Sequence, residues 1–199
     1  MSKLVQGIGI NGNKYPSFEG GKVSKEYNLW ISMLHRCTEK FWTKNPAYIG
    51  VTCSDNFRNY TFFYEWCQLQ VGFKSKDEKE KYWQLDKDLL LHDNNVYSED
   101  TCIFIPQRIN KLFTKNNATR GEWPIGVSWD KQTEMFKAYC NNHSRRLKYL
   151  GYFHSAQEAF QAYKTFKEAL IKQVADEYKT QLDIRVYEAL MNYEVSEND

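Results

Sequence analysis

The chain has 199 residues, 16% of them aromatic, which is enough for one generous core or two small domains. Its formal net charge of +2 is too small for global attraction to nucleic acid, so any such contact must rely on local basic patches. No apolar run approaches the ~18 residues that a membrane span needs, and the amino terminus lacks the apolar core of a secretion signal. We therefore expect a cytosolic protein without a membrane partner.

The amino-terminal part predicts an arm followed by a helix. Residues 1–22 are rich in Gly and Asn and show little periodicity, which predicts an extended arm or loop. Trp30, Met33 and Leu34 then recur at helical spacing, which predicts a helix over residues 25–37 with one buried stripe.

Residues 48–53 predict a short strand, and residues 60–71 predict an aromatic-rich helix. The aromatic side chains of this helix either stack on bases or pack in the core. Their i, i+3, i+4 spacing favours the core.

Residues 83–113 predict a strand, a polar loop, a second strand and a helix opened by Pro106. This order places Asp86 on the first strand and Asn110 on the helix. Their oxygens suit a hard divalent cation, which needs oxygen ligands and open positions for substrate and water. The alternative is a hairpin in which a buried Asp86 holds the turn.

A general base is harder to assign in this segment. Lys87 follows Asp86, and its unperturbed pKa of about 10.4 lies far from the operating pH that favours a base. The adjacent carboxylates of Asp86 and Asp88 are expected to favour its charged form. His92, in the loop after the strand, is the substitute candidate.

The helix after the second strand and its exit loop carry four basic residues and no acidic one between residues 106 and 120. This segment is either a phosphate-contacting surface or a solvated helix face. The basic residues are Arg108, Lys111, Lys115 and Arg120.

Three β-like runs follow, over residues 123–131, 135–141 and 147–153, and then a long helix from residue 155 to about residue 179. Ser155 and Glu158 form an S-x-x-E capping box at the start of that helix. The runs predict a three-stranded sheet braced by the helix.

Strand alternation separates the two faces of this predicted sheet. With Phe136, Ala138 and Cys140 turned toward the helix, the intervening side chains face outward. Residues 121–154 hold five basic and three acidic residues, an excess suited to phosphate contacts. The alternative is a sheet with a merely solvated polar face. The candidate outward residues are Ser128, Lys131, Lys137, Tyr139, Asn141, Arg145, Arg146 and Lys148.

The long helix predicts an apolar stripe that extends beyond the sheet. A second helix over residues 182–193 either folds back as a helical hairpin, contacts the preceding domain or forms a dimer interface. The last five residues are expected to fray. The stripe residues are Ala159, Tyr163, Phe166, Leu170 and Val174.

The segment 83–113 resembles the ββα metal core of the phage HNH homing-endonuclease family, whose core runs D-H in the first strand and N in the helix. The words W-x-x-M-L-x-R-C (Trp30 to Cys37) and Y-x-G-V-x-C (Tyr48 to Cys53), and the aromatic word F-x-x-F-x-x-W around residues 57–66, lengthen the match. The resemblance implies a metal-dependent endonuclease or nickase.

By this resemblance, Asp86 and Asn110 would hold Mg²⁺ or another divalent cation in this chain. Lys87 stands where the family has His; many phage relatives carry Arg there, and such a cationic residue could contact the scissile phosphate. Some HNH relatives also bind zinc. Packing in the core is favoured over a zinc site for the cysteines concerned, which are Cys37, Cys53, Cys67 and Cys102.

The words G-V-S-W-D-K, F-K-A-Y and L-G-x-F-x-S-x-x-E-A-x-x-A-Y resemble the ethylene-response-factor type of DNA-binding domain. In that family a three-stranded sheet lies in the major groove of DNA and a helix braces its back. Plant members read bases with several arginines. Here most of those places hold Ser128, Tyr139 and Asn141.

Together these patterns predict an α+β fold: an arm (1–22), an HNH-like domain (23–120), a DNA-binding sheet and helix (121–179) and a C-terminal helix and tail (180–199). Three functions stay open: an endonuclease or nickase, a DNA-binding descendant that no longer cuts, and an interaction protein directed at a host factor. The resemblance implies double-stranded DNA as partner, a monomer or homodimer, and the cytoplasm of an infected bacterium.

Replacing Arg145 and Arg146 with Ala is expected to weaken DNA binding and flatten its dependence on salt, because fewer counterions are released per complex. Affinity measured over a series of salt concentrations tests this. An unchanged slope would remove these arginines from the binding surface.

Overall fold

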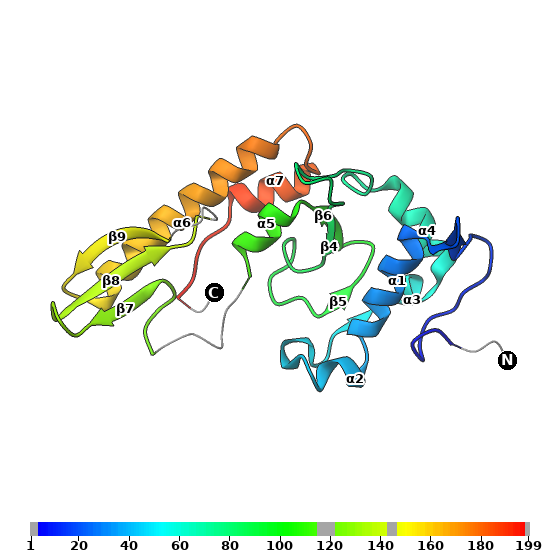
Figure 1. The fold of residues 1–199 in the computed structure, drawn as a ribbon, viewed down its shortest axis with the longest axis horizontal. Helices are drawn as coiled ribbons and strands as arrows, with labels where there is room; N and C mark the ends of the chain where they lie inside the picture. Colours follow the sequence, from blue (N-terminus) through cyan, green and yellow to red (C-terminus); the bar gives the residue numbers. More distant parts are fainter. Residues whose placement is uncertain (1–3, 115–121, 143–146, 198–199) are drawn as a thin grey trace. The chain divides into compact units, whose positions relative to one another are not determined.

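The computed structural model describes residues 4–114, 122–142 and 147–197 (Figure 1). Helices are mixed with small, mostly antiparallel sheets, so the predicted α+β class is confirmed. The chain divides into two compact units, Met1–Ile105 and Pro106–Asp199. Each is described by itself.

The first unit is built on α1 (Lys25–Arg36) and α4 (Tyr60–Leu69), which pack against each other. Ser24 caps α1 by accepting the backbone N–H of Tyr27. Trp30 on α1 is fully buried, and its indole N–H donates to the carbonyl of Phe57 at 2.8 Å. The predicted helix over residues 25–37 is therefore confirmed.

The aromatic side chains of α4 form the core of this unit, as their spacing predicted. Tyr60 and Phe63 are fully buried. The ring of Trp66 lies 4.8 Å from that of Phe57 and 5.8 Å from that of Phe104. Short elements complete the helical part: α2 (Glu39–Trp42), the 3-10 turn η1 (Pro46–Tyr48) and α3 (Asp55–Arg58).

The amino-terminal segment lies against this core. Ile10 donates its backbone N–H to Arg58 and accepts the N–H of Tyr60. Gly9 is so close to α1 that a Cβ there would lie 2.3 Å from a methyl carbon of Leu34. The segment begins with a turn, in which Val5 and Gly9 exchange backbone hydrogen bonds, and it is fixed by backbone contacts. It continues into the hairpin of β1 (Phe18–Glu19) and β2 (Lys22–Val23).

Two further strand pairs complete the first unit. β3 (Thr52–Cys53) runs parallel to β5 (Val96–Tyr97), and β4 (Gln84–Asp86) runs antiparallel to β6 (Ile103–Ile105). All of β6 is buried. The predicted strand, loop and strand are confirmed.

The second unit begins with α5 (Gln107–Leu112) and continues into the sheet of β7 (Val127–Asp130), β8 (Met135–Cys140) and β9 (Lys148–Phe153). The strands are antiparallel in the order β7-β8-β9. The long helix α6 (Ala156–Tyr178) lies along one face of this sheet (Figure 1). Its capping box, Ser155 with Glu158, is confirmed.

The helix α7 (Ile184–Met191) folds back on α6, so the predicted helical hairpin is confirmed. The hydroxyl of Tyr187 donates to Asp176 of α6 at 2.8 Å. The predicted stripe is partly wrong, because Phe166 is only half-buried whereas Ile171 and Ala175 join Val174 in the core. The face of α6 that meets α7 is rotated from the face that meets the sheet.

The expectation that all of the last five residues fray is also wrong. Val195 is buried; its backbone N–H donates to Glu168 and its carbonyl accepts from Lys164, both at 2.9 Å. Ile125, just before β7, donates its N–H to the carbonyl of Glu197 at 3.3 Å. These contacts fix the tail along α6.

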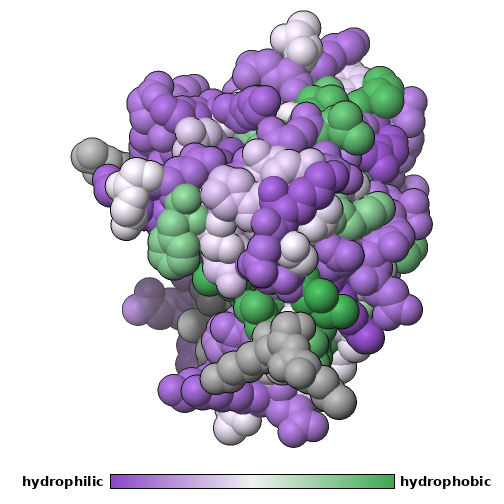
Figure 2. Space-filling model, turned by 90° about the vertical axis from the view of Figure 1, so that its right-hand side faces the viewer, coloured by the Kyte–Doolittle hydropathy of each residue, from purple (hydrophilic) through white to green (hydrophobic). Residues whose placement is uncertain are grey.

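The surface drawn in Figure 2 is mostly hydrophilic, with apolar residues in small separate groups. This agrees with a chain in which 26% of the residues are charged and both signs are nearly balanced.

Candidate functional site

Asp86 ends β4, and one of its carboxylate oxygens holds the following turn. Oδ1 accepts the backbone N–H groups of Asp88 at 3.0 Å and Leu89 at 2.9 Å. Burial raises the pKa of Asp86, and the two backbone hydrogen bonds oppose that rise. Among the described residues, Oδ2 of Asp86 makes no hydrogen bond. Oδ2 could therefore bind a cation without loss of the turn, whereas Oδ1 could not.

Lys87 points away from Asp86 and into the core. It continues the buried alternation of Trp83 and Leu85 and is only 6% exposed. Its ammonium forms an ion pair with Asp88 and donates to the carbonyl of Asn94 at 2.5 Å. An ammonium held in this way has no lone pair with which to accept a proton. The geometry therefore gives Lys87 a structural contact and not the position of a general base.

Asn94 completes this loop closure. Its side-chain amide donates to the carbonyls of Lys87 at 2.7 Å and Val96 at 2.8 Å, and its oxygen accepts the N–H of Val96 at 2.9 Å. Asn94 is 7% exposed. The loop from β4 to β5 thus closes around two buried polar side chains, each of which donates a hydrogen bond to the backbone carbonyl of the other residue.

Replacing Lys87 with Met is expected to lower the free energy of unfolding by about 1–3 kcal/mol, because the buried carbonyl of Asn94 loses its donor. Chemical denaturation measures the change. Lys79→Met, at an exposed position in the same unit, is the matched control and should change little. Equal effects of the two substitutions would contradict the structural role of Lys87.

The other predicted catalytic residues belong to different units, His92 to the first unit, like Asp86, and Asn110 to the second. His92 lies in the exposed loop after β4, and its Nδ1 is 3.1 Å from the carboxylate of Asp93. Asn110 lies on α5, in the second unit. Within the described ranges, no group of three or more His, Cys, Asp or Glu side chains is placed to hold a metal. The cation site stays a prediction.

The cysteines of the first unit are free thiols. Cys53, Cys67 and Cys102 are buried. Burial raises the pKa of Cys67 above its ordinary value, and that of Cys102 to about 12. These thiols pack as small apolar groups.

The basic residues of α5 differ in how they are engaged. Arg108 forms an ion pair with Glu177 of α6, within the second unit. Lys111 is exposed and makes no ion pair with any residue that the structure describes. Lys115 and Arg120 lie outside the described residues. Arg108 thus helps to dock α5 on α6, and only Lys111 is seen to face solvent with an uncompensated charge.

The sheet of the second unit has one covered and one open face. Ala138 and Cys140 of β8 are buried against α6. The register aligns Ser128, Lys137 and Tyr152 across the three strands, and Tyr139 with Tyr149, on the opposite side. We call this side the outer face; its residues are Ser128, Asp130, Lys137, Tyr139, Tyr149 and Tyr152.

A β-bulge in β9 places Tyr149 on the outer face, which strand alternation alone did not predict. The register shifts between Ala138 and Tyr139, so that Tyr149 and Tyr152 lie on the same side. Gly151 at the bulge has φ of 137°, which favours glycine. A glycine inside a strand pattern was the available signal.

The bulge also changes the position of Lys148. The register pairs it with the helix-facing Cys140 and not with a residue of the outer face. Lys131 is exposed in the turn between β7 and β8, and Asn141 is exposed after β8. Arg145 and Arg146 lie outside the described residues.

The single cation of the described outer face is paired within that face. Lys137 forms an ion pair with Asp130, and the hydroxyl of Tyr152 donates to the same carboxylate at 3.1 Å. The ammonium of Lys137 and the N–H of Gln132 hold the pKa of Asp130 at about 2, against an ordinary value of 3.8. Asp130 in turn raises the pKa of Lys137. The described outer face is therefore close to neutral.

The depressed pKa of Asp130 predicts an acid-sensitive contribution to stability. The contribution is fully present above the ordinary value of 3.8 and is lost as the pH falls towards about 2. Asp130→Asn should be less stable than the wild type at neutral pH, and the two should converge on acidification. Chemical denaturation between about pH 5 and about pH 2 tests this. A constant difference over that range would contradict the pairing.

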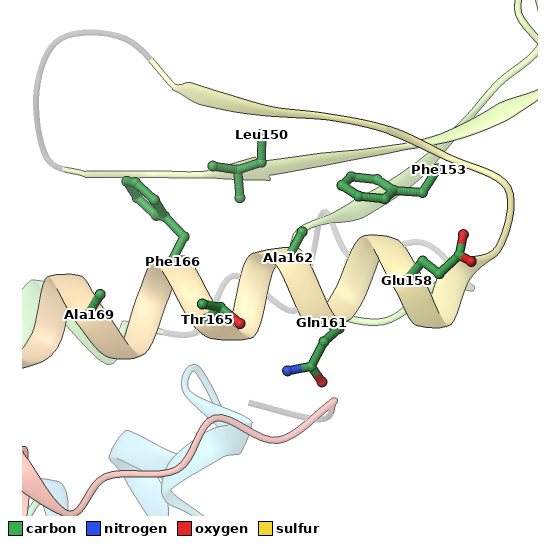
Figure 3. Close-up of a pocket in the computed structure, with 8 residues that line it drawn as sticks. All are labelled: Leu150, Phe153, Glu158, Gln161, Ala162, Thr165, Phe166 and Ala169. Atoms are coloured by element: carbon green, nitrogen blue, oxygen red, sulfur yellow. The ribbon is translucent and has the colours of Figure 1, made fainter.

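An open groove of about 700 Å³ lies between β9 and α6 (Figure 3). Its walls are mainly apolar, with Leu150 and Phe153 from β9 and Phe166 from α6. Glu158 lies at one end, where its carboxylate accepts the backbone N–H of Ser155 in the capping box. The groove therefore presents no catalytic set of side chains.

Comparisons with models of protein families, with curated proteins and with solved structures gave no match. Within the ranges that the structure describes, no helix is long and apolar enough to cross a membrane.

Proposed function

We propose that this chain is a DNA-binding protein that contacts double-stranded DNA through the outer face of its three-stranded sheet. The observation that carries the proposal is the sheet itself, braced by α6 on one face and open on the other. A narrow sheet fits the major groove, which is about 12 Å wide. Hydroxyl and ammonium groups on such a face can donate to phosphate oxygens.

The resemblance to the ethylene-response-factor type of domain supports the proposal. That resemblance rests on the words that place Val127, Phe136 and Leu150 in the three strands and Ala159 and Tyr163 on the helix. Ala159 and Tyr163 are buried where the helix meets the sheet. These side chains lie where a helix that braces a sheet needs them.

The residues of the first unit favour DNA binding without cleavage. Mg²⁺ prefers octahedral coordination by oxygen, but Asp86 leaves only Oδ2 outside the turn. Lys87 is occupied by Asp88 and Asn94. Among the described residues, no group of three or more His, Cys, Asp or Glu side chains is placed to hold a metal, and we derive no hydrolytic step.

A gel-shift assay with duplex DNA and a nicking assay on supercoiled plasmid with Mg²⁺ or Mn²⁺ test the proposal together. We expect the full chain to shift duplex DNA at low salt and to leave the plasmid intact. No shift at low salt would overturn the proposal and favour an interaction protein.

Nicking would establish an endonuclease if it is lost in Asp86→Ala and Asn110→Ala. Asp77→Ala is the matched control for Asp86→Ala, because Asp77 also holds a turn: its Oδ1 accepts the N–H groups of Lys79 at 2.8 Å and Lys81 at 3.0 Å. Nicking that is retained in Asp77→Ala and lost in Asp86→Ala would separate a chemical role from loss of a turn.

A further inference from the structure

Three tyrosine rings lie side by side on the outer face. The ring centroids of Tyr139 and Tyr149 are 6.1 Å apart, and those of Tyr149 and Tyr152 are 5.6 Å apart. Tyr149 is 47% exposed and Tyr152 is 40% exposed. These rings lie on the side of the sheet that α6 does not cover, so packing against the helix does not explain them.

The charge of the outer face disfavours a fully paired duplex as its best ligand. Duplex affinity comes largely from cations that neutralise phosphates and release counterions. The one cation of the described outer face, Lys137, is already neutralised by Asp130. Lys131 is exposed in the turn at the margin of the sheet and can contact a backbone that crosses it.

Exposed aromatic rings offer a stacking surface that unpaired bases can reach and paired bases cannot. In a duplex the faces of the bases are covered by their neighbours, whereas unpaired bases can stack on aromatic side chains. Sheets that display aromatic rings bind single strands in this way. The bulge at Gly151 brings two of the rings together on one face.

We propose that the outer face binds unpaired bases, so that single-stranded or locally unpaired DNA binds more tightly than the paired duplex. Tyr149 and Tyr152 stack on the bases, and Lys131 contacts the phosphates. The inference rests on the proposed function, because it specifies the form of DNA that the same face takes.

Fluorescence anisotropy with the full chain tests this, with a labelled oligothymidylate and a labelled duplex of the same length as probes. The single strand should bind more tightly, with a shallower dependence on salt. Tyr149→Leu should weaken binding of the single strand about ten-fold, because it removes the ring. Tyr149→Phe is the matched control: it retains the ring and should bind like the wild type.

Asp130→Asn supplies an independent readout, because it leaves the charge of Lys137 uncompensated. It should strengthen duplex binding and steepen its salt dependence, and so narrow the preference for the single strand. Thermal unfolding followed by circular dichroism confirms that each variant is folded.

The outcomes separate the two proposals. If the duplex binds as tightly as the single strand, or if folded Tyr149→Leu binds the single strand like the wild type, the inference is overturned while DNA binding stands. If neither probe binds at low salt, both proposals fall.

Discussion

The open face of the sheet depends on how closely α6 covers the other one. Ala138 and Cys140 are small enough to let the helix approach, and both are buried. Gly126 lies so near the helix that a Cβ would be 2.1 Å from the ring of Tyr163, and its φ of 78° also favours glycine. A larger residue at this position would push the helix from the sheet. With α6 bound to one face, the outer face of the sheet is left open.

Internal ion pairs decide which cations are available to such a ligand. Lys87 pairs with Asp88, Arg108 with Glu177 and Lys137 with Asp130. Each of these cations stands in a segment whose sequence suggests phosphate contact or catalysis. The structure instead uses them to close a loop, to dock a helix and to order a sheet face. The proposed attraction to DNA would then rely on exposed cations beside the sheet, while β8 and β9 of the outer face carry aromatic rings.

The sequence predicts the structural features that depend on residues close together in the chain. The buried stripe of α1, the strand order around Asp86 and the capping box at Ser155 follow from periodicity and local side-chain chemistry. Partners distant in the chain are not encoded in this way. Arg108 and Glu177 are 69 residues apart, and no local pattern links them.

The bulge at Gly151 and the tail contacts are harder to predict for the same reason. A single glycine shifts the register of β9 and exchanges the faces of Lys148 and Tyr149. The tail is fixed by Lys164 and Glu168, whose spacing on the helix equally suits a solvated ion pair. Alternation rules assume regular strands, so the outward position of Tyr139 could be predicted but that of Tyr149 could not.

Asp86 matches a position of the family motif and also holds a turn through one carboxylate oxygen. Asp77, outside any proposed site, binds two backbone N–H groups through one oxygen just as Asp86 does. Short polar side chains commonly form such turns, because they satisfy backbone donors that no strand partner reaches. The position of Asp86 is therefore fully explained without a cation. On the outer face, the ring of Tyr149 is 47% exposed on the side of the sheet that α6 does not cover, and this exposure is the observation behind its proposed contact with bases.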